Sequence, residues 1–191
     1  MQIFKTTTGL KGFLEDCRDN NKKISLVPTM GGLHDGHLKL VDRARAISDI
    51  VVVSIFVNPT QFARGEDFED YPNTLSSDQK KLESKGVDVL FLPSKGEIYP
   101  DGLHNDYKVG EIGQILCGAF RPSHFDGVAQ VVQRFFDIVK PDYSVFGEKD
   151  YQQLLIIKSL VDKLKLDILI ESVETQREID GLAMSTRNQY L

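Results

Sequence analysis

The stretch ISLVPTMGGLHDGH, residues 24–37, decides the fold of this chain. It opens with an apolar run of strand length, which Pro28 is expected to end. A glycine-rich turn follows, where the missing Cβ atoms let backbone approach backbone or a ligand. The turn leads to His34 and His37, and residues 36–47 then carry apolar side chains at helical spacing. The pattern predicts a buried strand, a tight turn and a helix that begins at two histidines.

The start of this predicted helix suits an anion. Its first turn has uncommitted N–H groups and the positive end of the helix dipole. His34 and His37 are three residues apart and face the same side of that turn. Two satisfied surface histidines are the alternative, but the strand–turn–helix context favours a polyphosphate site. The chemistry that fits is attack on the α-phosphorus of a nucleoside triphosphate, where one preorganised donor contributes about 10²–10³ in rate.

The rest of the chain alternates between strand-like and helical patterns. This alternation predicts an α/β fold with a parallel sheet and right-handed crossovers. Ligands of such sheets gather outside the carboxyl ends of the strands, so Asn58, Gln61 and Tyr71 are expected to face a site. Besides the opening strand, the expected strands lie within 50–57, 87–93, 142–150 and 167–173, and the expected helices are 10–17, 36–47, 74–85, 128–139 and 151–164.

Composition narrows the function further. The chain has 191 residues, enough for one sizeable α/β domain, and a net charge of −5 with no basic cluster, so no nucleic-acid partner is expected. The longest apolar run, residues 50–57, is far shorter than the roughly 18 residues of a membrane span. The start of the chain lacks the apolar core of a signal peptide. Cys17 and Cys117 have neither metal-site nor redox spacing, which favours reduced thiols in a cytoplasmic protein.

Two further motifs carry suitable chemistry. In GEKD, residues 147–150, Lys149 is placed to neutralise phosphate oxygens and Asp150 to accept from a ribose hydroxyl, although a solvated charged turn fits equally well. Gln153 follows one turn later on the same side. In MSTR, residues 184–187, the arginine can clamp phosphates in a fork that lysine cannot reproduce, but taken alone this segment fits a surface loop better.

Together the motifs carry a resemblance. PTMGGLHDGH, SIFVNPTQF, YPDG, RPSHFDGV, FGEKDYQQL and REIDGLAMSTRNQYL, in that order, closely resemble the pantothenate synthetase (pantoate–β-alanine ligase) family from about residue 24 to residue 191. The resemblance implies a Rossmann-like sheet with helices on both faces over residues 1–175, and the start of a small C-terminal lid domain at 176–191. It also implies a homodimer. The implied reaction joins ATP and (R)-pantoate, with Mg²⁺, to pantoyl adenylate and pyrophosphate; β-alanine then gives pantothenate and AMP.

The resemblance also assigns site residues by matching motif. His37 would be the proton donor, with His34 and Lys149 beside it on the phosphates. Gln61 would contact pantoate and β-alanine, and Gln153 would contact pantoate. Asn58, Tyr71 and His124 would line or support the same pocket. The implied ATP contacts are Met30, Gly31, Gly32, Leu33, His34, Asp35, Gly36, His37, Gly147, Glu148, Lys149, Asp150, Gln176, Met184, Ser185, Thr186 and Arg187.

The chain departs from the family pattern at several points. Ser76 and Ser77 stand where consecutive aspartates are common, which leaves Asp78 as the best candidate metal contact. Gln176 replaces a usual valine, and Thr186 replaces a serine but keeps the hydroxyl. Family members also continue for many tens of residues as a lid that keeps water from a labile intermediate. The expectation is therefore a fragment that is competent to bind but poorly active.

Two alternatives stay open at this stage. A nucleotidylyltransferase would share the two histidines but end with a nucleotidylated product rather than AMP. A nucleotide-binding and dimerisation module without catalysis would bind ATP and release no AMP.

Overall fold

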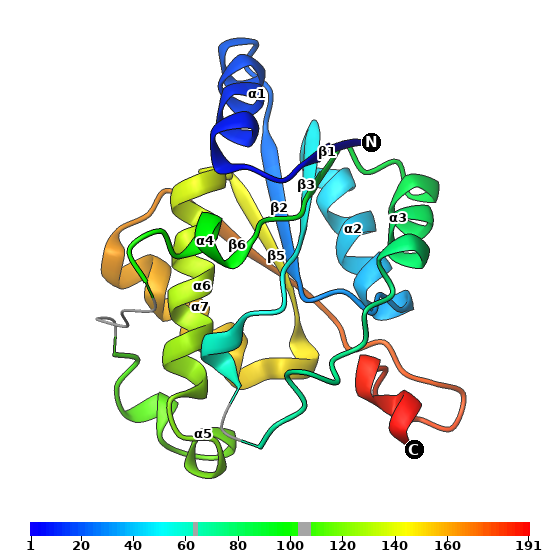
Figure 1. The fold of residues 1–191 in the computed structure, drawn as a ribbon, viewed down its shortest axis with the longest axis vertical. Coiled ribbons are helices and arrows are strands. Elements are labelled where there is room, and N and C mark those ends of the chain that lie inside the picture. Colours follow the sequence, from blue (N-terminus) through cyan, green and yellow to red (C-terminus); the bar gives the residue numbers. More distant parts are fainter. Residues whose placement is uncertain (63–64, 103–107) are drawn as a thin grey trace.

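Six parallel strands form one sheet in the computed structural model, which describes residues 1–62, 65–102 and 108–191 (Figure 1). The strand order is β1-β4-β3-β2-β5-β6. The central strands are rich in buried, β-branched residues, as expected where helices cover both faces of a sheet. The strands are β1 (Gln2–Phe4), β2 (Ile24–Thr29), β3 (Ile50–Ile55), β4 (Val89–Phe91), β5 (Tyr143–Gly147) and β6 (Leu169–Val173).

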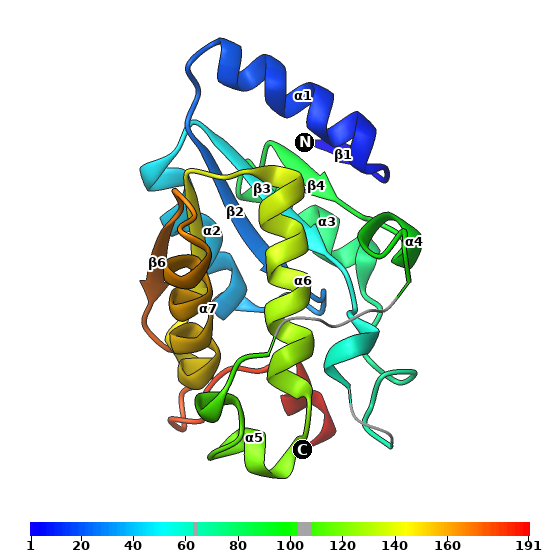
Figure 2. The same ribbon diagram turned by 90° about the vertical axis from the view of Figure 1, so that its left-hand side faces the viewer.

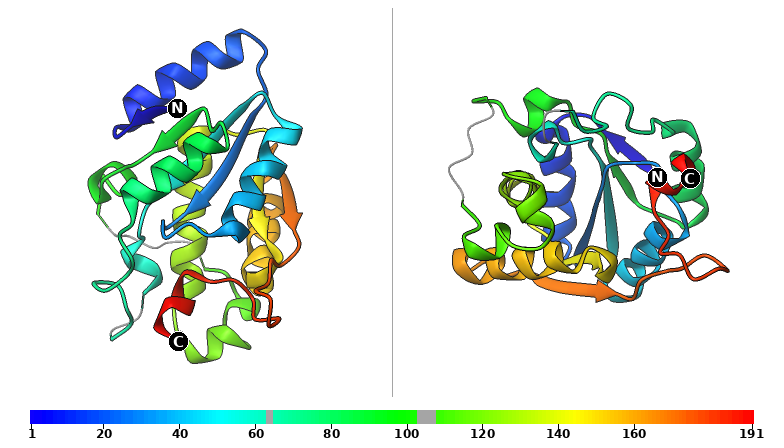
Figure 3. Two further views of the ribbon diagram at one scale, coloured as in Figure 1. Left: turned by 90° about the vertical axis from the view of Figure 1, so that its right-hand side faces the viewer. Right: turned by 90° about the horizontal axis from the view of Figure 1, so that it is seen from below.

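Helices pack on both faces of this sheet (Figures 2 and 3). On β3, Val52 packs into one core while Val51 and Val53 pack into the other, because successive side chains of a strand point to opposite faces. One face carries α1 (Thr7–Asp19), α6 (His124–Val139) and α7 (Tyr151–Leu164), and the other carries α2 (Asp35–Ile47) and α3 (Leu75–Ser84). Shorter pieces are α4 (Lys95–Ile98), α5 (Cys117–Phe120) and the 3₁₀ turns η1 (Pro59–Gln61), η2 (Glu111–Gly113), η3 (Glu148–Asp150) and η4 (Thr186–Tyr190).

The order of the strands places a crevice beside β2. From β2 the chain proceeds through β3 and β4 toward one edge, whereas β5 and β6 extend the sheet on the other side of β2. Such a reversal point, at the carboxyl ends of the strands, is where open α/β sheets bind ligands. The predicted α/β, Rossmann-like parallel sheet with helices on both faces is confirmed.

Some element boundaries differ from those expected. β2 continues through Pro28 to Thr29 instead of ending at the proline. The ladder between β2 and β5 pairs only Ser25 and Leu26, so Pro28 lies beyond its end, where a missing N–H costs this ladder nothing. α6 begins at His124, four residues before the expected start. β1, α4 and α5 were not expected at all. Among the described residues, no helix is long and apolar enough to cross a membrane.

Candidate active site

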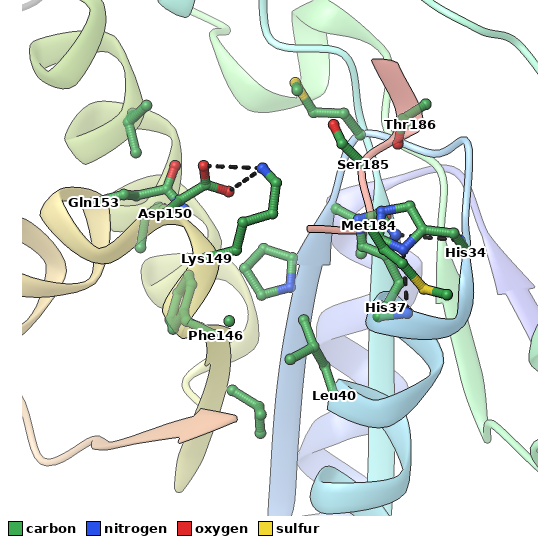
Figure 4. A pocket seen from close by; sticks show the side chains of 18 of the residues that line it. His34, His37, Leu40, Phe146, Lys149, Asp150, Gln153, Met184, Ser185 and Thr186 are labelled. Carbon is green, nitrogen blue, oxygen red and sulfur yellow. Dashed lines mark hydrogen bonds and ion pairs between the residues drawn. The ribbon is translucent and has the colours of Figure 1, made fainter. Parts of the chain in front are cut away.

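A pocket opens at the carboxyl ends of β2 and β5, between α2, α6 and the C-terminal segment (Figure 4). It brings together residues from the HDGH, NPTQF, GEKD and MSTR motifs, which lie far apart in the sequence. The predicted site residues that line it are Met30, His34, Gly36, His37, Asn58, Gln61, Tyr71, Gly147, Lys149, Asp150, Gln153, Gln176, Met184, Ser185, Thr186 and Arg187. Gly31, Gly32, Leu33, Asp35, Asp78, His124 and Glu148 are not among the described residues that line it.

His34 and His37 cap the first turn of α2 with reciprocal hydrogen bonds. His34 is the N-cap residue, and its Nδ1 accepts the N–H of Gly36 at 3.1 Å. The Nδ1 of His37 accepts the N–H of His34 at 3.3 Å, and the ring centroids are 4.1 Å apart. Because each Nδ1 is an acceptor, each neutral ring carries its proton on Nε2. Two Nε2–H donors are therefore available at the pocket.

The surroundings keep both rings neutral. Burial lowers the pKa of His37 to about 3, with further lowering by His34, Lys149 and Lys81. Burial also lowers the pKa of His34, reinforced by the same two lysines and opposed by Asp35. At pH 7 the site therefore combines neutral imidazole donors with the positive charge of Lys149.

The glycine turn before these histidines is held by a buried carboxylate. Asp78 on α3 is 1% exposed, and its two oxygens accept the N–H groups of Gly32 at 3.0 Å and Leu33 at 2.9 Å. The hydroxyl of Thr74 donates to the same carboxylate, and Lys81 donates to the carbonyl oxygen of Leu33. With both oxygens engaged by the turn, the geometry gives Asp78 a structural task and does not support its prediction as a metal contact.

Lys149 and Asp150 project from the turn that joins β5 to α7. The Lys149 Nζ lies 3.2 Å from a carboxylate oxygen of Asp150, and both side chains are substantially exposed. Figure 4 shows Lys149 between Asp150 and Gln153 on one side and the histidines on the other. Its neighbour Glu148 turns away and accepts a hydrogen bond from Ser172 at 2.9 Å. An ammonium in this position can neutralise an anion that also contacts the imidazoles.

Gln61, on the turn η1, also lines the pocket. Its Nε2 is 2.9 Å from the Sδ of Met30, and its Oε1 accepts from Asn58. His124 supports the same turn from behind, since its Nδ1 is 2.6 Å from the carbonyl oxygen of Gln61. Arg121, paired with Glu66 at 2.7 Å, lies 2.9 Å from the His124 Nε2. His124 therefore supports the turn and does not itself line the pocket.

The C-terminal segment, which contains residues 184–187, lines part of the pocket. The hydroxyl of Thr186 donates to the carbonyl oxygen of Gly32 at 3.0 Å, and a Cβ on Gly32 would collide with the methyl group of Thr186. Arg187 pairs with both carboxylate oxygens of Asp67, at 2.7 and 2.8 Å, and stacks over Tyr71. The structure thus brings the MSTR motif to the pocket, with its guanidinium bound to a carboxylate.

Sequence reasoning missed the apolar wall of the pocket. Four of its residues come from α6, a helix that the sequence predicts without assigning any part of it to the site. Side chains at the N-terminal end of an apolar stripe can face a ligand, but periodicity does not separate ligand contacts from core contacts. The apolar residues of the wall are Pro28, Leu40, Phe56, Val128, Val131, Val132, Phe135, Val145 and Phe146; the polar lining residues Thr29, Glu174 and Thr175 were also missed.

Metal binding by the protein alone has little support. Residues 1–62, 65–102 and 108–191 contain no group of three or more His, Cys, Asp or Glu side chains placed to hold an ion. Mg²⁺ in nucleotide sites commonly keeps one or two carboxylates and completes its shell with phosphates and water. The pocket offers Asp150 and Glu174 for this purpose, so its donor set fits an ion that arrives with a nucleotide.

Comparison with known proteins places these features in a family. The Pantoate-beta-alanine ligase family model matches residues 2–191. Pantothenate synthetase from Ruthia magnifica is 52% identical over 191 residues, covering 100% of this chain and 68% of that protein. Pantothenate synthetase from Aquifex aeolicus is 52% identical over 189 residues, covering 99% of this chain and 67% of that protein. The chain thus spans about two thirds of the length of these relatives.

Solved structures agree. Pantothenate synthetase from Thermus thermophilus superposes with a TM-score of 0.94 at 46% identity, covering 100% of this chain and 68% of that one. Pantoate-beta-alanine ligase from Francisella tularensis, described as complexed with beta-gamma ATP and beta-alanine, gives a TM-score of 0.95 at 44% identity, covering 100% and 73%.

Proposed function

Because the chain belongs to the pantoate–beta-alanine ligase family, we propose that it ligates pantoate to β-alanine in two steps that use ATP. In the first step a pantoate carboxylate oxygen attacks the α-phosphorus, and the bond to pyrophosphate breaks. In the second, the amine of β-alanine attacks the carbonyl carbon of pantoyl adenylate, and AMP leaves. Both steps need positioned reactants and stabilised charge more than covalent help from the protein.

The first step uses the cluster of donors at the start of α2. His34 and His37 donate from Nε2–H to phosphate oxygens, and the Lys149 ammonium neutralises charge on the leaving pyrophosphate. The family resemblance implied a proton donor at His37. A pKa of about 3 makes an imidazolium scarce at pH 7, so we assign His37 to hydrogen-bond donation instead. Arg187 contributes to the phosphates once it leaves Asp67.

The acid substrate lies against the apolar wall. Gln61 and Gln153, which both line the pocket, bind the oxygens of pantoate, while the apolar wall covers its geminal methyl groups. Asp150 or Glu174 would hold a Mg²⁺ ion that arrives with the ATP phosphates, and the ion would supply further charge neutralisation. The homodimer implied by the family resemblance is a separate prediction. Sedimentation velocity would test it by measuring the oligomeric state of the chain in solution.

One observation carries the proposal: the imidazoles, the ammonium and two glutamine amides face one pocket at the reversal point of the sheet. The test is AMP release by the purified chain with ATP, Mg²⁺ and (R)-pantoate, measured with and without β-alanine. We expect pantothenate to form only when β-alanine is present, and AMP to accumulate faster with β-alanine than without it.

The other outcomes have definite meanings. A stable nucleotidylated product would identify a nucleotidylyltransferase and contradict the proposal. ATP binding with no pyrophosphate release would leave only a nucleotide-binding module. Lys149→Ala should lower pyrophosphate release, and an unchanged rate and ATP affinity in that variant would remove Lys149 from the site.

A further inference from the structure

The side-chain amide of Gln61 can present either of its ends to a substrate. An oxygen would accept from an amine or hydroxyl, whereas an N–H would donate to a carboxylate or hydroxyl oxygen. The two cases select different chemical groups. What fixes the amide therefore determines what Gln61 can bind.

The neighbouring amide of Asn58 has only one possible orientation. Asn58 is 1% exposed, and its Oδ1 accepts the backbone N–H of Thr60 at 3.3 Å. Its Nδ2 donates to the backbone carbonyl oxygen of Gly127 at 3.1 Å. A backbone N–H can only donate and a carbonyl can only accept, so these two contacts define which atom is oxygen and which is nitrogen. Gly127 makes this approach possible, because a Cβ there would collide with the carbonyl oxygen of Thr60.

Asn58 in turn orients Gln61. The Asn58 Nδ2 donates to the Gln61 Oε1 at 3.2 Å, so the amide oxygen of Gln61 faces Asn58. The Gln61 Nε2 then points toward the Sδ of Met30 at 2.9 Å. A thioether is a weak acceptor, and a substrate oxygen is a better one. Gln61 thus presents N–H donors to the pocket.

Behind this pair lies Tyr99, the tyrosine of the YPDG motif. Its hydroxyl donates to the Asn58 Oδ1 at 2.7 Å, the shortest hydrogen bond that this amide makes. The residue is 6% exposed, and its ring lies 6.3 Å from that of Phe56. Burial raises the pKa of Tyr99, which keeps the hydroxyl protonated as a donor. Tyr99 is not among the described residues that line the pocket. Its hydroxyl also lies 3.4 Å from the hydroxyl of Thr60, but the contact with Asn58 is shorter, and removal of the hydroxyl alone leaves the ring beside Phe56 in place.

We propose that Tyr99 is a positioning residue: its hydroxyl holds Asn58 in place, and Asn58 keeps the N–H donors of Gln61 facing a substrate oxygen. Under the proposed function, on which this inference rests, that oxygen belongs to the carboxylate or hydroxyl of pantoate. The nucleotide does not depend on this chain of hydrogen bonds.

Tyr99→Phe tests the proposal, because it removes one hydroxyl and keeps the buried ring. The dissociation constant for (R)-pantoate, measured by titration calorimetry, should rise about three- to tenfold, the range for one neutral hydrogen bond. The constant for ATP should stay unchanged. Tyr143→Phe on β5 is the matched control and should alter neither constant. A loss of ATP affinity parallel to that of pantoate, with a lower melting temperature, would mean a general structural role and overturn the proposal.

A double-mutant cycle with Gln61→Ala separates the role of Gln61 in pantoate binding from the positioning role of Tyr99. If Tyr99 acts through Gln61, Tyr99→Phe has no further effect on pantoate binding in the Gln61→Ala background. Additive losses would overturn the positioning role. If Gln61→Ala alone leaves pantoate affinity unchanged, the proposed pantoate site is wrong. If Gln61→Ala weakens pantoate binding and Tyr99→Phe does not, the site stands and only the role of Tyr99 fails.

Discussion

Two imidazole rings that accept backbone N–H groups at Nδ1 are held as neutral donors at Nε2. In His34 and His37 the capping of α2 therefore sets the chemistry of the site. Protonation of Nδ1 would break these capping hydrogen bonds, so the bonds favour the neutral ring. Burial acts in the same direction, because it also lowers the pKa of each ring. The same two side chains therefore both cap the helix and supply the hydrogen-bond donors of the site.

His37→Asn separates the two tasks, because its amide oxygen can still accept the N–H of His34 while the Nε2–H is lost. The rate of pyrophosphate release should fall about 10²–10³-fold, the range for one lost preorganised donor. Lys39→Ala, on the exposed side of the same helix, is the control and should be silent. A His37→Asn rate within a factor of a few of the parent would exclude this donor role.

The low pKa of His37 predicts how stability depends on pH. An unfolded histidine titrates near 6.5 and the folded one near 3, so the unfolded state binds more protons between these values. The stabilisation is complete above about pH 6.5 and is lost as the pH falls toward 3. Between pH 7 and pH 5 the wild type should lose about 1–2 kcal/mol more unfolding free energy than His37→Asn. Urea denaturation of both proteins at the two pH values measures this, and equal losses would contradict the shift.

At the scale of elements, the glycine turn is joined to α3 through Asp78. Asp78→Asn would set an amide N–H₂ against a backbone N–H and leave a buried donor unsatisfied, at a cost of about 1–3 kcal/mol. ATP affinity should fall about tenfold, with Mg²⁺ and equally in EDTA. Glu83→Gln, on the exposed side of the same helix, controls for the charge change. A loss confined to Mg²⁺-containing solutions would instead identify Asp78 as a metal contact.

The C-terminal segment is held by the guanidinium of Arg187, a group that also binds phosphate well. Arg187 grips Asp67 with two nitrogens, so the phosphates of ATP and this carboxylate compete for one guanidinium. Arg187→Lys cannot form a bidentate contact and should raise the ATP dissociation constant about five- to twentyfold. Arg43→Lys, which also weakens a carboxylate pair on α2, should leave ATP binding intact. Equal ATP affinities in all three proteins would remove Arg187 from the phosphate site.

Long amphipathic elements were predictable and short ones were not. The α7 pattern gave the observed bounds, Tyr151–Leu164, because five of its buried residues follow a helical period. β1 has three residues at the edge of the sheet and takes its conformation from pairing with β4, which no local pattern reveals. The bond between Tyr99 and Asn58 joins residues 41 positions apart in turns of irregular structure, so spacing gave no sign of it.

At the scale of the whole molecule, the sheet order explains why distant motifs meet. β2 and β5 are neighbours although more than a hundred residues separate them, and each delivers its following turn to the same crevice. Alternating strand and helix patterns predicted the parallel sheet and its functional edge. They did not predict that the wall of the pocket would come from α6. Val128, Val131, Val132 and Phe135 belong to the hydrophobic core and also line the pocket, so one apolar stripe has both roles.

The proposed function requires His34, His37 and Lys149 to bind one triphosphate in this crevice. A crystal structure of the chain with a non-hydrolysable ATP analogue and Mg²⁺ tests it most directly. We expect phosphate oxygens within hydrogen-bond distance of the Nε2 atoms of both histidines and of the Lys149 Nζ. A triphosphate bound elsewhere, with these three side chains facing only solvent, would contradict it.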